Sequence, residues 1–103
     1  MSNDPIGSLL GIAAKGRNVV SGEFSTEEAV KKHRAFLVII ANDASDNTKK
    51  SFSNMCEFYH VPIFFYADKD TLGRFIGCEM RAGVAVIDQG LAQALIKKLQ
   101  DRD

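Results

Sequence analysis

The side chains that could hold a metal ion or act as a nucleophile are few and widely spaced. The chain has two histidines, His33 and His60, and two cysteines, Cys56 and Cys78. Their separations match no zinc-binding pattern. Cys56 falls on the apolar face of an expected helix, where a buried thiol is inert, and nothing around Cys78 marks an activated nucleophile. We therefore expect no metal site, no cofactor and two reduced cysteines that form no disulfide.

An acidic and a basic residue that follow two expected strands suggest a different chemistry. Asp43 and Lys69 each come after an apolar run, and the carboxyl ends of parallel strands meet at one edge of a sheet. Such a pair could hold a phosphate group or Mg²⁺, as in a phosphoacceptor receiver domain. That domain also needs acidic residues after its first strand, where this chain has Ser21 and Gly22. Solvated turn residues that cap helices are the simpler interpretation.

The glycines give no nucleotide-binding loop. The sequence has neither a Walker loop nor a GxGxxG motif. Gly73 and Gly77 fall within and after a short expected helix, where glycine shapes the backbone. We therefore expect no cradle for a phosphate at these glycines.

Patterns of apolar residues predict strands and helices in turn along the chain. Strands are expected at residues 17–21, 36–41, 63–67 and 83–88, with the run FLVIIA at 36–41 as the central strand, buried on both faces, and 63–67 as a second buried strand. Helices are expected at residues 5–15 and 26–34, and around residues 52–59, 72–76 and 91–99. This alternation predicts an α/β fold, a three-layer α/β/α sandwich on a mixed, mostly parallel sheet of about four strands.

Capping residues indicate where several of these helices begin. Asp4 precedes a proline, as an N-cap residue often does. Ser25 and Glu28 have the spacing of a capping box for the second helix. Asp70 is expected to cap the short fourth helix, and Gly77 is expected to supply a left-handed residue at its end.

The composition predicts one globular domain over residues 1–103. Apolar residues make up 46% of the chain, and 13 Lys and Arg balance 13 Asp and Glu. The apolar stretches are too short to span a membrane, and the opening MSNDPIGSLL lacks a basic leader, so we expect a cytoplasmic protein without membrane contact. Because the net charge is zero, a nucleic-acid site would have to be local.

Three segments carry a family pattern: LVIIAND with the following Ala44 and Ser45, then VPIFFYADKDTLGRFIG, then CEMRAGVAVID. Together they resemble the L7Ae and L30e ribosomal-protein family, which binds kink-turn RNA. The resemblance spans about Leu10 to Ala94, and the opening KGRNVVSGE is similar to a bacterial branch of small RNA-binding proteins. It implies an α/β/α sandwich that recognises sharply bent RNA through one end of its sheet, without catalysis.

The resemblance implies a first RNA-binding segment at the turn and helix start after the first strand. The family typically has Gly-x-Asn-Glu there, with a lysine further along the helix. The matching positions here are Gly22, Phe24, Ser25 and Glu28, so only the glycine is kept. Glu28 would face RNA with the wrong sign of charge. The kink-turn motif of this chain is therefore weakened.

The resemblance implies a second RNA-binding segment in the loop before the last strand. Glu79 keeps the acidic residue of the family, Met80 offers a flexible apolar contact for a splayed base, and Arg81 could stack or pair with phosphate. Lys31 and Lys32, further along the helix, match positions that are commonly basic in the family. Without the resemblance, the loop and this helix surface would both be interpreted as solvated. The expected RNA-binding residues are Gly22, Glu23, Phe24, Ser25, Lys31, Lys32, Cys78, Glu79, Met80 and Arg81.

The sequence thus predicts a non-enzymatic, monomeric RNA-binding protein. Its partner would be kinked or bulged structured RNA, in the ribosome or in another ribonucleoprotein. An alternative of another class is a protein-interaction module that has kept the fold and lost RNA recognition, since three positions of the family motif are replaced.

Overall fold

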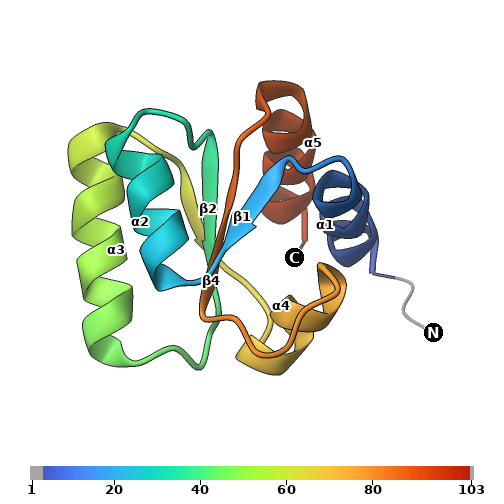
Figure 1. The fold of residues 1–103 in the computed structure, drawn as a ribbon, viewed down its shortest axis with the longest axis horizontal. Helices are drawn as coiled ribbons and strands as arrows, with labels where there is room; N and C mark the ends of the chain where they lie inside the picture. The colour runs from blue at the N-terminus through green and yellow to red at the C-terminus, as the bar shows by residue number, and fades with distance from the viewer. Residues whose placement is uncertain (1–3, 103) are drawn as a thin grey trace.

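The computed structural model describes residues 4–102, in which five helices alternate with four strands (Figure 1). Residues 1–3, the start of the segment expected to lack a leader, and residue 103 lie outside the described residues. The helices are α1 (Pro5–Lys15), α2 (Glu23–Lys31), α3 (Asp46–Tyr59), α4 (Lys69–Phe75) and α5 (Gln89–Gln100). The strands are β1 (Val19–Ser21), β2 (Leu37–Ile40), β3 (Ile63–Phe65) and β4 (Gly83–Val86).

The four strands form one mixed sheet in the order β1-β4-β2-β3. This confirms the α/β fold and the number of strands, but the expectation of mostly parallel pairing is wrong. β2 and β3 are parallel, whereas β4 is antiparallel to both of its neighbours, β1 and β2. The reason is the short α4, which stays at the end of the sheet where β3 stops, so that β4 starts there and runs back (Figure 1).

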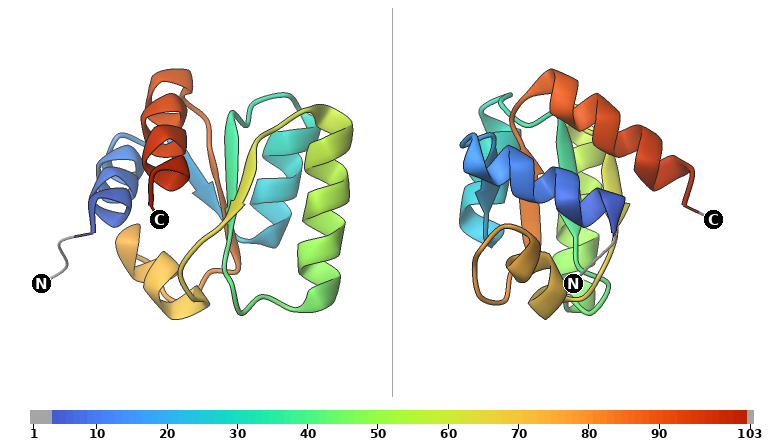
Figure 2. Two further views of the ribbon diagram at one scale, coloured as in Figure 1. Left: turned by 180° about the vertical axis from the view of Figure 1, so that it is seen from behind. Right: turned by 90° about the vertical axis from the view of Figure 1, so that its right-hand side faces the viewer.

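Two helical layers cover the sheet, α2 and α3 on one face and α1, α4 and α5 on the other (Figures 1 and 2). The side chains of β2 alternate between the two faces: Leu37 and Ile39 pack with the α1, α4 and α5 layer, and Val38 and Ile40 with the other. All four are fully buried, which confirms the central strand. β3 is instead half-buried, because it lies at the edge of the sheet, so the expectation of a second buried strand is wrong.

Two of the expected helix ends are confirmed. The carboxylate of Asp4 accepts hydrogen bonds from the backbone N–H groups of Ile6 (2.9 Å) and Gly7 (3.2 Å) at the start of α1. Gly77 follows α4 with a φ of +77°, in the left-handed region that glycine adopts without strain.

Two other helix starts differ from the expectation. α2 begins at Glu23, with Gly22 as its N-cap residue, so the capping box of Ser25 and Glu28 does not form. The early start follows from the glycine, whose φ of +92° allows the chain to turn directly from β1 into the helix. α4 is capped by Asp68, whose side chain accepts from the N–H of Thr71 (2.7 Å), and the expected cap, Asp70, lies two residues later in the first turn of the helix.

Candidate nucleic-acid interface

Four chain connections meet at the end of the sheet where β1, β2 and β3 stop and β4 starts, at the bottom of Figure 1. We call this end, residues 21–25, 41–45, 66–69 and 78–82, the sheet tip. Three backbone hydrogen bonds join the connections: Gly22 N–H to Gly83 C=O (2.9 Å), Ala41 N–H to Ala82 C=O (2.8 Å) and Asn42 N–H to Ala67 C=O (2.7 Å). Both expected RNA-binding segments therefore lie side by side.

The first segment turns from β1 into α2 and leaves its surface open. Within residues 4–102, no heavy atom beyond its chain neighbours lies within 4 Å of the position that a Cβ at Gly22 would take. The carboxylate of Glu23 accepts from the Thr48 hydroxyl (3.3 Å), so this side chain faces α3. Phe24 in the first turn of α2 is 78% exposed, and Ser25 beside it is half-buried. The segment thus offers an open backbone and one exposed ring.

The second segment, Cys78 to Arg81, is held firmly against the rest of the molecule. A Cβ at Gly73 would collide with the carbonyl oxygen of Glu79, so the loop packs directly on the backbone of α4. The N–H of Arg81 donates to the carbonyl of Lys69 (3.0 Å). Met80, between these anchors, is left 55% exposed. The loop therefore presents an apolar side chain from a fixed backbone.

Arg81 ties the two segments together. Its Nε donates to the hydroxyl of Ser21 at the end of β1 (3.1 Å), and its Nη1 donates to the carbonyl of Met80 (2.9 Å). The sequence predicts that this guanidinium contacts RNA, but the structure commits two of its nitrogens to the protein. In the structure it links the backbone of Met80 to Ser21, the residue before Gly22.

The structure does not bring Lys31 and Lys32 to the sheet tip. They stand at the opposite end of α2, and each pairs with a glutamate one turn earlier: Lys31 with Glu27 (2.6 Å) and Lys32 with Glu28 (3.3 Å). These pairs are exposed and add little stability. The ten expected RNA-binding residues thus divide into eight at the tip and two elsewhere.

Asp43 and Lys69 do meet at the sheet tip, as their positions after two strands predict. The contact uses the backbone N–H of Lys69, which donates to the carboxylate of Asp43 (2.8 Å). This arrangement agrees with the interpretation of both as turn residues. Nowhere in the described part of the chain do three or more His, Cys, Asp or Glu residues gather as a metal site.

Both cysteines are free, as expected. Cys56 lies on the buried face of α3, and burial raises the pKa of its thiol to about 11. The thiol therefore stays protonated near neutral pH. Cys78 is half-buried in the tip loop, and its Sγ lies 3.9 Å from the carbonyl oxygen of Ile76.

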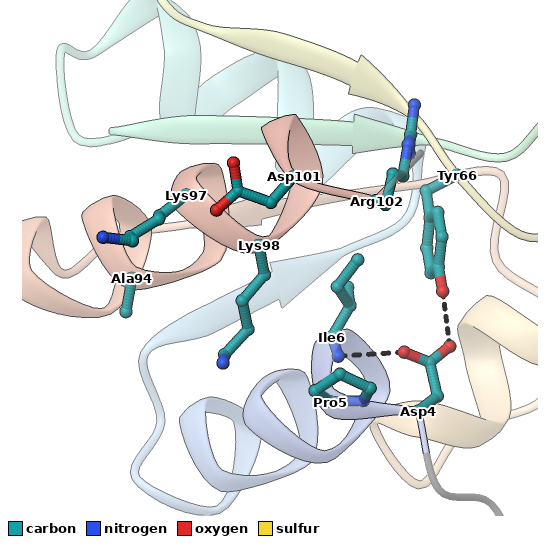
Figure 3. Close-up of a pocket in the computed structure, with 9 residues that line it drawn as sticks. All are labelled: Asp4, Pro5, Ile6, Tyr66, Ala94, Lys97, Lys98, Asp101 and Arg102. Atoms are coloured by element: carbon teal, nitrogen blue, oxygen red, sulfur yellow. Dashed lines mark hydrogen bonds between the residues drawn. The ribbon is translucent and has the colours of Figure 1, made fainter.

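A separate hollow of about 520 Å³ lies between α1, α5 and the end of β3, and Tyr66 of the sheet tip forms part of its wall (Figure 3). The hydroxyl of Tyr66 donates to the Asp4 carboxylate (2.5 Å), and the Arg102 guanidinium lies 5.3 Å from the centre of the Tyr66 ring. Burial, together with the bond to Asp4 and its charge, raises the pKa of Tyr66 to about 12. Lys97 and Lys98 stand at the rim of the hollow (Figure 3). The sequence gives no sign of this hollow, because its walls come from elements far apart in the chain.

Comparison with known protein families places this sequence in one whose members share this kind of fold. The sequence model of the ribosomal protein L7Ae/L30e/S12e/Gadd45 family matches residues 4–96. The chain belongs to this family. In the described residues, no helix has the length and apolar character that a membrane span needs.

Two relatives carry the same name, RNA-binding protein YlxQ. That of Bacillus subtilis (strain 168) is 45% identical over 91 residues, which cover 88% of this chain and 91% of the relative. That of Enterococcus faecium is 31% identical over 86 residues, which cover 84% and 82%. The expected similarity to a bacterial branch is confirmed. The family and these relatives are named for ribosomes and RNA and not for a reaction, in agreement with the prediction of a non-enzymatic protein.

Two solved structures share the fold. A protein with unknown function from Bacillus halodurans superposes with a TM-score of 0.93 at 32% identity, over 96% of this chain and 100% of that one. The 15.5kD RNA binding protein of Giardia lamblia superposes with a TM-score of 0.80 at 22% identity, over 97% and 92%. The second likeness shows the fold alone.

Proposed function

We propose that this protein binds structured RNA and that the sheet tip recognises a kinked or bulged segment. Family membership and the names of the two bacterial relatives support RNA as the partner. The observation that carries the proposal is the bond from Arg81 Nε to Ser21 (3.1 Å), which fixes the two expected segments next to each other. A partner that bends could touch both segments at once.

The tip suits bases that are splayed out of a helix. Gly22 leaves room for close approach of an RNA backbone, because no Cβ stands in the way. The exposed thioether of Met80 can adapt to the flat face of an unstacked base. Recognition of shape and of unpaired bases, which is typical of proteins that bind folded RNA, needs no more cations than the tip provides.

The finer preference follows from the residues in the first turn of α2. Phe24 and Ser25 stand where the family motif has an asparagine and a glutamate, so their side chains cannot make the same hydrogen bonds. We therefore propose a partner defined by its bend and its unpaired bases more than by particular base pairs, in ribosomal RNA or another ribonucleoprotein. In this proposal residues 1–103 act as one monomeric domain in the cytoplasm.

The test compares a kinked RNA, a bulged RNA and a plain duplex of equal length at one stated salt concentration. We expect kinked or bulged RNA to bind at least about tenfold more tightly than the duplex, equal to about 1.4 kcal/mol. Met80→Asp should remove this preference, since it places a negative charge against the bases. The control, Gln93→Asp, adds the same charge on the exposed side of α5. Equal binding to all three RNAs would contradict the proposal.

A protein partner is the second candidate, favoured by one observation. Phe24 and Met80 are both large, apolar and exposed (78% and 55%), while Arg81 is already bonded within the protein. Exposed apolar side chains beside a guanidinium that is already bonded suit a protein surface. A captured partner that survives nuclease treatment and is lost with Met80→Asp would favour this candidate over RNA.

A further inference from the structure

The end of α2 opposite the sheet tip carries an unbroken run of basic side chains. Residues 31–34 read Lys-Lys-His-Arg, and all four are exposed. The last turn of α3 and the residue after it, 58–60, stand beside them at the top of Figure 1. We call residues 31–34 and 58–60 together the far end.

A row of three aromatic rings joins the two parts of the far end. The rings of His33 and Tyr59 meet edge to face with their centres 5.6 Å apart, and those of Tyr59 and Phe58 meet in the same way at 4.9 Å. The first contact crosses from the end of α2 to the end of α3. Basic side chains and exposed rings therefore form one continuous surface.

Backbone hydrogen bonds hold both turns of the far end. Arg34 N–H donates to the carbonyl of Ala29 (2.9 Å) after α2, and Val61 N–H donates to the carbonyl of Cys56 (2.8 Å) after α3. His33 and His60 take the left-handed conformation that closes each helix. The rings and cations thus stand on two fixed helix ends and not on a loose loop.

Phe58 has a ring face available for stacking. Its side chain is 75% exposed, and the Tyr59 ring stands at 78° to it, so its neighbour does not cover it face to face. Nucleic-acid bases stack on such rings in proteins that bind single strands, with little dependence on sequence because every base has a flat face. A base is a suitable partner for this ring.

The cations of the far end are held weakly or not at all by acidic partners, so phosphates can compete for them. Glu27 and Glu28, the partners of Lys31 and Lys32, lie one turn back along α2, and exposed pairs of this kind are weak. Arg34 has no ion pair among the described residues. Glu57, next to Phe58, is the remaining acid close by in sequence. The outermost side chains are therefore basic, although the whole chain is neutral.

We infer that the far end is a second RNA-binding surface, which holds a single-stranded segment with a base stacked on Phe58 and phosphates on Lys32 and Arg34. The inference rests on the proposed function, because the strand would extend from the RNA that the sheet tip holds. α2 links the two surfaces, and its nine residues span about 13 Å, which a few nucleotides can bridge. Three positively charged side chains within four residues, those of Lys31, Lys32 and Arg34, favour a polyanion over a protein as the partner.

The test measures the affinity of one bulged RNA with and without a single-stranded extension, and of the extension alone. We expect the extension to tighten binding by about tenfold, the size expected for one stacked base. Phe58→Ser should abolish this gain and leave the affinity for the unextended RNA unchanged. The side chain is exposed, so the fold should persist, which circular dichroism checks.

A second variant removes the charges and leaves the ring. Lys32→Gln with Arg34→Gln should reduce the slope of log affinity against log salt by about 1.4 for extended RNA, since each phosphate contact to a single strand contributes about 0.7. The matched control, Lys97→Gln with Lys98→Gln, removes two charges from exposed positions on α5 and should not change the gain from the extension.

The outcomes separate the two proposals. Equal affinity for extended and unextended RNA would overturn the second surface and leave the sheet tip intact. Binding of the extension alone that is lost with Phe58→Ser, without any preference for bulged RNA, would support the far end and overturn the tip. A nuclease-resistant protein partner that is lost with Phe58→Ser, with no effect of the RNA extension, would overturn the second surface in favour of a protein-binding one.

Discussion

The two ends of α2 are built in different ways. At the sheet tip, backbone hydrogen bonds and the close contact of Gly73 with the next loop fix segments that are distant in sequence. At the far end, aromatic side chains at the C-terminal ends of α2 and α3 contact each other edge to face, and exposed lysines lie beside them. The tip therefore has a defined shape and little free positive charge, while the far end has charge and rings.

This difference suggests a division of labour within the proposed RNA binding. Contacts to phosphates position a nucleic acid, whereas contacts to bases and to shape give selectivity. The rigid tip is suited to choose the RNA, and the cationic far end is suited to strengthen and orient the complex. Variants at the tip should change selectivity, and variants at the far end should change affinity and its salt dependence.

The largest expected effect comes from Gly73→Ala. The added Cβ must displace the carbonyl of Glu79, so the tip loop shifts and stability falls by about 1–3 kcal/mol, the usual cost of overpacking. Selective RNA binding should be lost, while binding of a single-stranded extension should remain. The control is Gly90→Ala, where the new Cβ makes only an ordinary contact with the Asp88 carboxylate (3.5 Å). Thermal unfolding measures the loss of stability, and RNA titration measures the loss of selectivity. Unchanged selectivity in Gly73→Ala would contradict the proposed difference between the two ends.

A smaller effect is expected from Arg81→Ala. Loss of the bond to Ser21 should cost about 1 kcal/mol of stability and loosen Met80. If Arg81 acts by positioning, Ser21→Ala should reproduce part of the loss in RNA selectivity, and the double variant should add little to Arg81→Ala. A double-mutant cycle measures this coupling. Independent effects of the two substitutions would mean that Arg81 touches the RNA itself.

A smaller effect still is expected from Glu28→Gln. The substitution frees Lys32 from its pair (3.3 Å), and stability should change by less than about 0.5 kcal/mol because such exposed pairs are weak. Affinity for extended RNA should rise, and its salt dependence should steepen, while the preference for bulged RNA stays constant. Asp70→Gln, which breaks a comparable exposed pair with Arg74 (3.3 Å) on α4, serves as the control. A changed preference for bulged RNA would show that the two ends do not act separately.

The smallest expected effect is no change, at the side chain of Tyr66, which lines the hollow between α1 and α5. Tyr66 keeps its proton to a pKa of about 12 when folded, against about 10 when unfolded, so its contribution to stability is complete below pH 10 and is lost as the pH rises towards 12. Absorbance at the tyrosinate band in a Tyr59→Phe background follows this single titration. The variants above should leave its midpoint in place, and a shift would show that they disturb the whole fold.

The sequence predicts the central strand and the position of the sheet tip well. The run FLVIIA can be buried on both faces only in the middle of a sheet, and β2 lies there. Asp4 caps its helix through contacts two and three residues away, which sequence spacing captures. The tip segments follow from strand ends, because each strand end fixes the place of the connection after it.

The remaining features depend on contacts between distant residues. The place of β4 beside β1 depends on where the short α4 directs the chain after it ends, which no local pattern encodes. The ring row needs His33 and Tyr59 to meet across two helices, and either residue alone looks like an ordinary helix end. Asp68 and Asp70 are equally good caps by type, and the backbone geometry after β3 selects the first.

The reversed direction of β4 has a consequence for how the protein matures during synthesis. In the described sheet, β1 has β4 as its one neighbour, and β4 is the last of the four strands to be made. Until the ribosome releases that strand, β1 is unpaired and the segments 21–25 and 78–82 of the sheet tip are not held together, because Gly22 is anchored to Gly83 at the start of β4. If the sheet tip binds bent RNA as proposed, a nascent chain would be unable to capture it early, and such non-local pairing also slows folding.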